Sequence, residues 1–345
     1  MSQKFSPLRE LTLCRLKEFL REPEAVFWVF FFPVLLALAL GLAFRQKAPD
    51  QIPVAVVEGV DAAKTAASLA ASPVLLPRVL AAKEAGEALR TGRVSLLVDL
   101  GPPALFRFDE TRPDSRIARL EARDALEQAA GRKDALSIAS ERVTEPGSRY
   151  IDFLVPGLLG MNLMGTGIWS LAFAIAMARK NGILKRLNAT PMRRSHFLLA
   201  QMLARLGFLV LEVVILVGFG WLAFGVAVRG SLLLFSAVCL LGALVFSGLG
   251  LLVAARPRTM EGANGLANLV MLPMWLLSGV FFSAERFPAK VQPYIAALPL
   301  TALNDALRGV MTQARPLSGI VPQLTVLVVW GLVSFVVALK IFRWR

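Results

Sequence analysis

The sequence contains few of the residues that enzymes most often use as bases, nucleophiles or metal ligands: it has one histidine and two cysteines in 345 residues. His196 cannot form an H-E-x-x-H zinc motif, because that motif needs a second histidine. Cys14 precedes the first long apolar run and Cys239 lies within a later one, so the hydrophilic part of the chain has no disulfide. We therefore expect neither catalytic residues nor a metal site, and a membrane-embedded enzyme is disfavoured.

Two further absences limit the function. No G-x-x-x-x-G-K-[ST] phosphate-binding loop occurs, so any ATP that drives this protein is bound by another polypeptide. Acidic residues are scarce outside residues 45–149: the rest of the chain holds nine acidic and twenty-two basic residues, which produce most of the formal charge of +14. Because these basic residues flank apolar runs, they are typical of membrane topology, and we expect no nucleic-acid partner.

Apolar residues, by contrast, make up 56% of the sequence, and the mean hydropathy is +0.62. This composition predicts an α-helical integral membrane protein. The first run, residues 26–44, has nineteen residues without a charge, and at about 1.5 Å per residue it can cross a hydrocarbon layer of about 30 Å. Its long polar leader favours an uncleaved anchor over a signal peptide. Five more transmembrane helices are predicted, at 151–178, within 197–226, at 232–255, at 262–282 and at 320–341.

The chain divides into four predicted parts. Residues 1–24 form a cytoplasmic interfacial helix with apolar side chains on one side and charged ones on the other, and 25–44 form transmembrane helix 1. Residues 45–149 form a small α/β extracytoplasmic domain, and 150–345 hold transmembrane helices 2–6. In the α/β domain we predict strands at 52–57, 95–100 and 104–108, helices at 61–71 and 82–91 between them, and a charged helix at 113–130.

The loop at 179–197 orients the whole chain. It holds six Lys or Arg residues and no acid, so the positive-inside rule places it in the cytoplasm. Six spans then put both termini on the cytoplasmic side and the inserted domain outside. Cysteines placed at Ser115 and Ser195 should accordingly differ in labelling by an impermeant reagent. Within the loop, Gly182 can end the preceding helix, and the residues after it are interpreted as a short helix that either docks a partner or lies on the lipid surface.

Residues 283–319, before the last span, contain four prolines among apolar residues. Helical pieces too short to span a membrane fit this pattern, so we predict a re-entrant helix pair at the extracytoplasmic end of a pathway, with a membrane-surface cap as the alternative. Asp305 and Arg308 can pair on one of these helices. In the fifth predicted span, Asn264 and Asn268 are expected to make packing contacts between helices.

The third predicted span contains one acidic residue, Glu212, and a carboxylate inside a membrane is a functional candidate by default. Arg205 lies seven residues earlier on the same face, and we expect it to snorkel to the interface, too far from Glu212 for direct contact. Glu212 is then either an ion-coupling group of a secondary transporter or a partner in a packing hydrogen bond. In the second case, Glu212→Gln would retain activity. The candidate pathway or gating residues are Glu212, Asn264, Asn268, Asp305 and Arg308.

Four features together resemble the membrane subunit of an ABC-2 type ABC transporter over nearly the whole chain: the interfacial helix, the hydrophilic insert after the first span, and two motifs. The first motif is G-x-L-K-x-L-x-x-T-P at 182–191, and the second, more specific one is L-S-G-V-F-F…F-P…L-P-L-T-A-L-N-D-A-L-R at 277–308. The commonest family pattern has acidic residues around the glycine, whereas this sequence has Lys180, Lys185 and Arg186. This departure bears on the subfamily and on the choice of partner.

The resemblance implies a permease subunit in a bacterial inner membrane, without a cofactor of its own, that docks on separate ATPase subunits carrying ATP and Mg. A second permease subunit, identical or a paralogue, would complete the pathway for a drug-like molecule or a lipid. A polysaccharide exporter of the same family and a secondary transporter are the alternatives, and a periplasmic partner of the inserted domain is left open. The docking residues would be Gly182, Ile183, Leu184, Lys185, Arg186, Leu187, Thr190 and Pro191.

Overall fold

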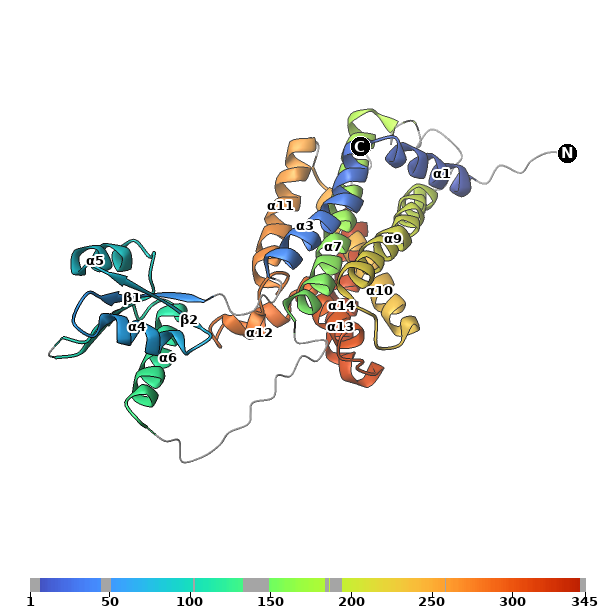
Figure 1. Ribbon diagram of the computed structural model, residues 1–345. Helices are drawn as coiled ribbons and strands as arrows, with labels where there is room; N and C mark the ends of the chain where they lie inside the picture. Colours follow the sequence, from blue (N-terminus) through green and yellow to red (C-terminus); the bar gives the residue numbers. More distant parts are fainter. Residues whose placement is uncertain are drawn as a thin grey trace. The chain divides into compact units, whose positions relative to one another are not determined.

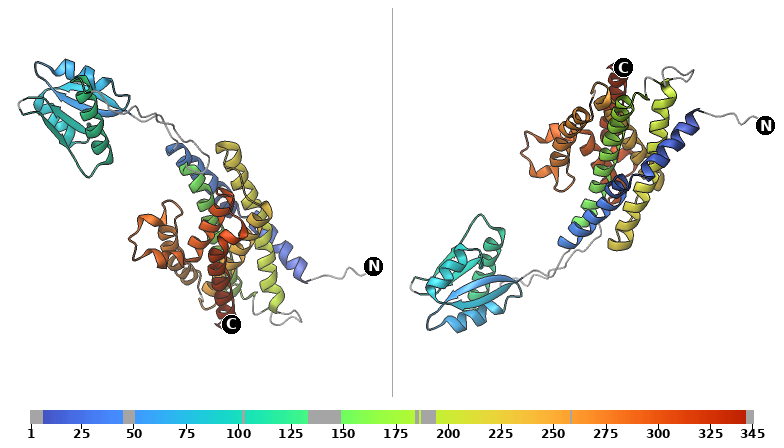
Figure 2. Two further views of the ribbon diagram at one scale, coloured as in Figure 1. Left: turned by 90° about the horizontal axis from the view of Figure 1, so that it is seen from below. Right: turned by 90° about the horizontal axis from the view of Figure 1, so that it is seen from above.

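The computed structural model describes residues 7–44, 51–101, 103–132, 149–183, 186, 194–257 and 259–341. The chain divides into two compact units (Figure 1, Figure 2). The membrane unit comprises Met1–Arg45 and Thr144–Arg345, and the inserted unit comprises Gln46–Val143. The α/β domain predicted at 45–149 includes the whole inserted unit.

The membrane unit is helical, and its first long helix is a composite of α2 (Pro23–Val26), the π-helix η1 (Phe27–Phe31) and α3 (Phe32–Ala43). Pro33 cannot donate an N–H to the preceding turn, and the wider π-turn directly before it accommodates this loss without breaking the helix. The other elements of this unit are α1 (Pro7–Leu20), α7 (Tyr150–Lys180), α9 (Arg194–Phe224), α10 (Leu232–Ala254), α11 (Met260–Leu277), η2 (Ala284–Arg286), α12 (Gln292–Ala296), α13 (Pro299–Met311), η3 (Leu317–Ile320) and α14 (Val321–Ile341).

Within the described residues, five helical segments are long and apolar enough to cross a membrane: Pro23–Ala43, Tyr150–Lys180, Leu199–Phe224, Leu232–Ala254 and Leu317–Ile341. They coincide with the first four predicted spans and the sixth. The fifth predicted span is a helix, α11, but it has 18 residues and carries Glu261, Asn264 and Asn268 in its first half, so it is more polar than the other five. The count of six spans and the cytoplasmic position of the termini stay predictions.

Helix α7 is the central helix of the membrane unit. Its most apolar part is 78% buried, whereas that of the segment ending in α14 is 17% buried. It packs against α3, α9, α10, α11 and α13 (Figure 1). Glycines permit this close packing: a Cβ at Gly157 would lie 2.7 Å from the Val280 carbonyl oxygen, and one at Gly160 would overlap Asn304 Oδ1.

Helix α1 packs against α9 through its C-terminal end. Phe19 is buried there, with its ring centroid 4.2 Å from that of Phe208 on α9 and 6.2 Å from that of Phe30 in η1. Leu20 is 59% exposed, so the membrane unit covers only part of the apolar side of this helix. The location of α1 at the membrane interface stays a prediction.

The inserted unit is built on a four-stranded sheet with the strand order β2-β1-β3-β4. Strand β1 pairs in parallel with β2 and β3, and β4 runs antiparallel to β3. Val54 and Val56 of β1 pack with α4 and α6 on one face, and Ala55 packs with α5 on the other (Figure 1). The elements are β1 (Ile52–Val57), α4 (Ala62–Ala70), β2 (Leu75–Leu80), α5 (Ala82–Arg90), β3 (Leu96–Asp99), β4 (Leu105–Phe108) and α6 (Pro113–Ala129).

Two expectations for the inserted unit need correction, although the other predicted strands and helices are confirmed to within one residue at each end. Strand β2 was not predicted, because Pro77 in its middle argues against a strand. Since β2 is at the edge of the sheet, the missing N–H can face solvent, and Pro77 is tolerated opposite Val54. A cysteine at Ser115 would not report the topology, because this residue is fully buried on α6.

Candidate functional site

The membrane unit buries an ion pair within one helix. Arg205 and Glu212 both belong to α9, and their side chains are 2% and 1% exposed. Arg205 Nη1 donates to Glu212 Oε1 at 2.9 Å and Nη2 donates to Oε2 at 3.1 Å, so the contact is bidentate. Seven residues rise by about 10.5 Å along a helix, and the two long side chains close this distance by extending toward each other. The expectation that Arg205 snorkels to the interface, out of reach of Glu212, is therefore wrong.

Thr166 of α7 joins this pair to a second helix. Arg205 Nη2 donates to Thr166 Oγ1 at 2.5 Å, and the same hydroxyl oxygen lies 3.3 Å from Glu212 Oε2 and 2.7 Å from the Asn162 carbonyl oxygen. The hydroxyl can accept from the guanidinium while it donates to one of the two oxygens. Asn162 Nδ2 in turn donates to the carbonyl of Val29, in the π-helix of the first span, at 3.2 Å. Asn162, Thr166, Arg205 and Glu212 form the buried polar network, which connects three transmembrane helices.

The buried polar network fixes how these helices fit together. Its two charges have lost their hydration, and removing one partner of a buried pair typically costs about 3–5 kcal/mol because the other charge stays uncompensated. An intact buried pair adds little net stability, since its attraction is offset by the lost hydration. The contacts with Thr166 instead set the rotation of α9 against α7. Arg205 Nε has no hydrogen-bond partner within the described residues, so the two terminal nitrogens make all of these contacts.

A second polar cluster ties α13 to α7 and α11. Arg308 Nε donates to the Phe153 carbonyl at 3.2 Å, Nη2 donates to the Gly279 carbonyl, and the guanidinium carbon lies 3.6 Å from the centre of the Phe153 ring. Asn304 Nδ2 donates to the Ser278 carbonyl at 3.0 Å. These two side chains thus satisfy carbonyl groups just past the end of α11, which have no partner within that helix.

The remaining candidate residues make local contacts. The predicted pairing of Asp305 with Arg308 is confirmed at 3.6 Å, although Asp305 is 47% exposed. Asn268 Nδ2 donates to Asn264 Oδ1 at 3.3 Å, so these amides bond to each other along α11. In the part of the chain that the structure describes, no hydrogen bond links them to Glu212, and no group of three His, Cys, Asp or Glu side chains is placed to hold a metal ion.

A polar contact at the start of α7 was not predicted. Arg149, directly before the helix, donates through Nε and Nη2 to the two carboxylate oxygens of Asp152 at 2.9 and 2.8 Å, and through Nη1 to the Phe224 carbonyl at 3.0 Å. Phe224 is the last residue of α9, so the contact joins the start of one long helix to the end of another. The three-residue spacing of Arg149 and Asp152 is the sequence signal that could have indicated the ion pair.

The predicted docking loop is described only in part. Helix α7 ends at Lys180 and Gly182 has a φ of +68°, so the prediction that this glycine ends the helix is confirmed. Ile183 is 39% exposed and Arg186 is exposed. The docking role stays a prediction, because Leu184, Lys185, Leu187, Thr190 and Pro191 lie outside the described residues.

Comparison with known proteins gives one family and several relatives. The family model described as ABC-2 family transporter protein matches residues 24–340. ABC transporter G family member 20 of Dictyostelium discoideum is 26% identical over 166 residues, which are 48% of this chain and 23% of that protein. The probable multidrug ABC transporter permease YbhS of Escherichia coli (strain K12) is 27% identical over 195 residues, 56% of this chain and 50% of YbhS. The inner membrane transport permease YhhJ of the same strain is 26% identical over 174 residues, which are 49% of this chain and 46% of YhhJ. The chain thus spans half or less of the length of each of these curated relatives.

Proposed function

Because this chain belongs to the ABC-2 transporter family, we propose that it is the permease subunit of an ATP-driven exporter whose substrates are hydrophobic or amphipathic, either drug-like molecules or lipids. ABC-2 permeases are multi-pass membrane proteins that work with ATP-binding subunits, and they are transport components rather than catalysts. The observation that supports the proposal most is that the family resemblance extends from the first span to the last. The name of YbhS, a probable multidrug permease, favours a drug-like substrate.

In the proposed exporter, two permease subunits form the pathway and separate ATP-binding subunits drive it. The loop at 179–197 docks on an ATP-binding subunit, with Leu184 in an apolar groove and Lys185 at the rim. Apolar anchors at interfaces commonly cost more than about 2 kcal/mol when they are removed, and an aspartate in the groove adds an unpaired buried charge. Rim charges mainly change the association rate and its salt dependence.

The docking role is tested by comparing Leu184→Asp with Lys185→Ala. We expect Leu184→Asp to insert normally but to lose both co-purification with the ATP-binding subunit and substrate-stimulated ATP hydrolysis, whereas Lys185→Ala retains most of both. A loop that lies on lipid would behave differently, since an aspartate could turn to water without affecting a partner. Wild-type values for Leu184→Asp would therefore remove the docking role.

Export itself is tested in inside-out vesicles that contain this chain and its ATP-binding subunit. Ethidium serves as the drug-like probe and a fluorescent phospholipid as the lipid probe. We expect ATP to drive the accumulation of at least one probe, and an ionophore that collapses ion gradients to leave this accumulation unchanged. Accumulation that needs the ion gradient and not ATP would instead identify a secondary transporter.

The contacts of Glu212 favour the ATP-driven alternative. An ion-coupling carboxylate must exchange its ion with water during transport. Glu212 is 1% exposed, and both of its oxygens accept hydrogen bonds from Arg205. Its partners therefore support a structural role between α9 and α7.

A further inference from the structure

The two edges of the sheet in the inserted unit differ. Strand β2 forms one edge and carries Pro77, which has no N–H to offer a further strand, whereas β4 forms the other edge and contains no proline. The outer edge of β4 pairs with no strand among the described residues. Unpaired backbone N–H and C=O groups along such an edge can bind another strand. The sheet can therefore be extended at β4.

An apolar hollow of about 310 Å³ lies beside β4, next to the last turns of α6. Its lining is mostly leucine, alanine and phenylalanine, with Arg123 and Glu127 as the charged members. Leu100 and Leu105 contribute to the lining and are 45% and 43% exposed. Apolar side chains thus remain uncovered at the same edge that has unpaired backbone groups.

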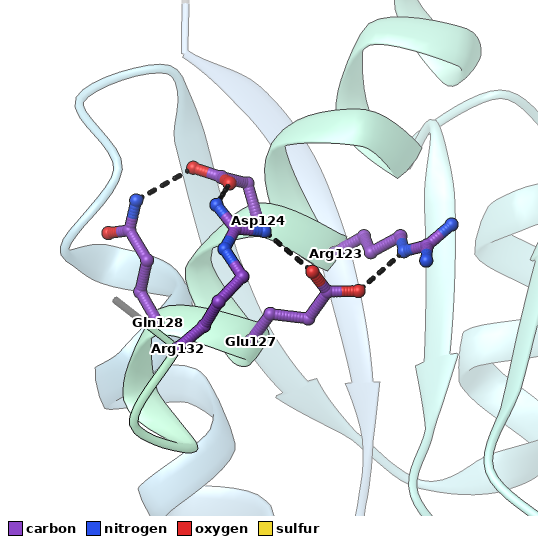
Figure 3. A network of polar contacts seen from close by, with 5 residues as sticks. All are labelled: Arg123, Asp124, Glu127, Gln128 and Arg132. Atoms are coloured by element: carbon purple, nitrogen blue, oxygen red, sulfur yellow. Dashed lines mark hydrogen bonds and ion pairs between the residues drawn. The ribbon is translucent and has the colours of Figure 1, made fainter. Parts of the chain in front are cut away.

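Arg123 and Glu127, the two charged residues of the lining, belong to a network of polar contacts that Figure 3 shows. Arg123 Nε donates to Glu127 Oε1 at 2.6 Å, Arg132 Nη1 donates to Glu127 Oε2 at 2.5 Å, and Arg132 also pairs with Asp124. The hydrogen bond from Arg123 holds the pKa of the Glu127 carboxyl below its usual value of 4.5, so the carboxylate stays ionised. The two cations and two anions of this network sum to zero, so the network itself would not select a charged ligand. Arg107 on β4 lies outside this network.

We infer that β4 pairs with β4 of a second copy of this chain, so that two inserted units form one continuous sheet and cover each other's hollows. The inference rests on the proposed function, in which two permease subunits assemble. A strand pair related by a two-fold axis is antiparallel and uses the same surface on both copies. The apolar hollow of one copy would therefore face the same hollow of the other copy. Gln46–Val143 contains fourteen basic and fourteen acidic residues, so net charge does not oppose this contact.

The two-fold pairing has a geometric consequence that cysteines can detect. It sets one residue of β4 directly opposite the same residue of the other copy, with Cα atoms about 4.5–5.5 Å apart, which lies within the range that a disulfide can bridge. We would place single cysteines at each of the four positions of β4 in the full chain, with Cys14 and Cys239 replaced by serine, and oxidise membranes that also contain the ATP-binding subunit. Matched controls at the β2 edge are Leu76→Cys and Val79→Cys, whose native side chains are 36% and 42% exposed.

We expect one β4 position to form a disulfide-linked dimer at about tenfold the yield of either β2 control, because only directly opposed residues come within disulfide range. Adding Leu100→Glu to that variant should reduce the dimer strongly, since two new carboxylates would be buried without partners. Leu100 follows β3 and is exposed, so this change leaves the core of the unit intact.

Each other outcome overturns the inference in a different way. Equal yields of the disulfide-linked dimer at β2 and β4 would reject the β4 contact. So would the absence of this dimer at β4 in a complex whose measured mass corresponds to two permease copies, and in that case the two-copy assembly would stand. A complex with a single copy would reject the assembly as well. A cross-linked product whose mass differs from that of a dimer would identify a different protein at β4.

Discussion

The two units of this protein hold their ion pairs in opposite surroundings. In the inserted unit, Arg123 and Glu127 bond at 2.6 Å with side chains that are 72% and 37% exposed. In the membrane unit, Arg205 and Glu212 bond at 2.9 Å with side chains that are 2% and 1% exposed. Water and salt screen the first pair and not the second, so two ion pairs of similar length have different consequences.

The difference reflects what holds each unit together. The inserted unit has its own apolar core between the sheet and helices α4 and α6, so its surface ion pairs can be lost without exposing that core. Helices in lipid gain little from burying apolar surface against one another, because lipid tails are equally apolar. Close packing at glycines and polar contacts such as the buried polar network must therefore specify how the membrane helices fit.

The contrast between the two units depends first on topology: the inserted unit and the loop at 179–197 should lie on opposite sides of the membrane. Ala63→Cys, at an exposed position on α4, should be labelled by an impermeant maleimide on intact cells, whereas Ser195→Cys should be labelled only after permeabilisation. Both variants lack Cys14 and Cys239. The fully buried Ser115→Cys serves as a control that stays unlabelled until the unit unfolds. The reverse pattern for Ala63→Cys and Ser195→Cys would invert the topology.

The next largest effect is expected at the buried pair. Glu212→Gln removes one charge and leaves Arg205 uncompensated, at a cost of about 3–5 kcal/mol, so the yield of folded protein and its melting temperature should both fall. The sequence alone predicts that this variant retains activity if Glu212 makes only a packing hydrogen bond, and the contact with Arg205 adds the prediction that the variant is less stable. Glu261→Gln, at an exposed position on α11, is the control and should melt like the wild type.

A double variant separates charge compensation from shape. If the cost of Glu212→Gln comes from the orphaned guanidinium, then Arg205→Gln combined with Glu212→Gln should recover much of the lost stability, because neither buried charge remains. A double variant as unstable as the single one would contradict this explanation. It would indicate that the hydrogen bonds to Thr166 matter more than the charges.

The sequence predicted those parts of the molecule that depend on local patterns. Apolar run length located the five helices that are long and apolar enough to cross a membrane, and a short apolar run located β1. Gly182 was predicted to end α7 because a left-handed residue is common there. Contacts between distant segments were not predictable in this way. Arg205 stays buried instead of snorkelling because it pairs with Glu212 and because Thr166, 39 residues earlier, gives it a further partner on α7.

Other parts escaped prediction for related reasons. Strand β2 was missed because only the sheet order reveals that Pro77 lies at an edge. The spacing of Asp305 and Arg308 indicated their ion pair, but the carbonyl groups that Arg308 binds lie 29 and 155 residues away along the chain. No local pattern identifies a backbone carbonyl as the partner of a particular side chain.

A smaller effect is expected where the membrane unit relies on close packing. The Cβ added by Gly160→Ala would overlap Asn304 Oδ1, so either Asn304 turns and gives up its hydrogen bond to the Ser278 carbonyl or α7 and α13 move apart, at a cost of about 1–3 kcal/mol. Gly165→Ala is the matched control on the same helix, because its Cβ would lie 3.7 Å from the end of Met271, an ordinary contact. A melting temperature lowered in the first variant only is the expected result. Equal melting temperatures would mean that the Asn304 side chain turns away without loss.

The smallest effect is expected at the exposed pair. Glu127→Gln should change the rate of backbone hydrogen exchange in the last turn of α6 by less than about threefold, because solvent already screens the pair.

Hydrogen bonds from Arg123 and Arg132 hold the pKa of the Glu127 carboxyl below 4.5. A depressed carboxyl pKa stabilises the folded state above the unfolded pKa, and this contribution is lost as the pH falls through the folded pKa. The slight difference between wild type and Glu127→Gln should therefore be present near neutral pH and vanish in acid, whereas Glu84→Gln, at an exposed position on α5, should show no difference at either pH. If Glu127→Gln destabilised the inserted unit as much as Glu212→Gln destabilises the membrane unit, the contrast between the two units would fail. An exposed ion pair would then matter as much as a buried one.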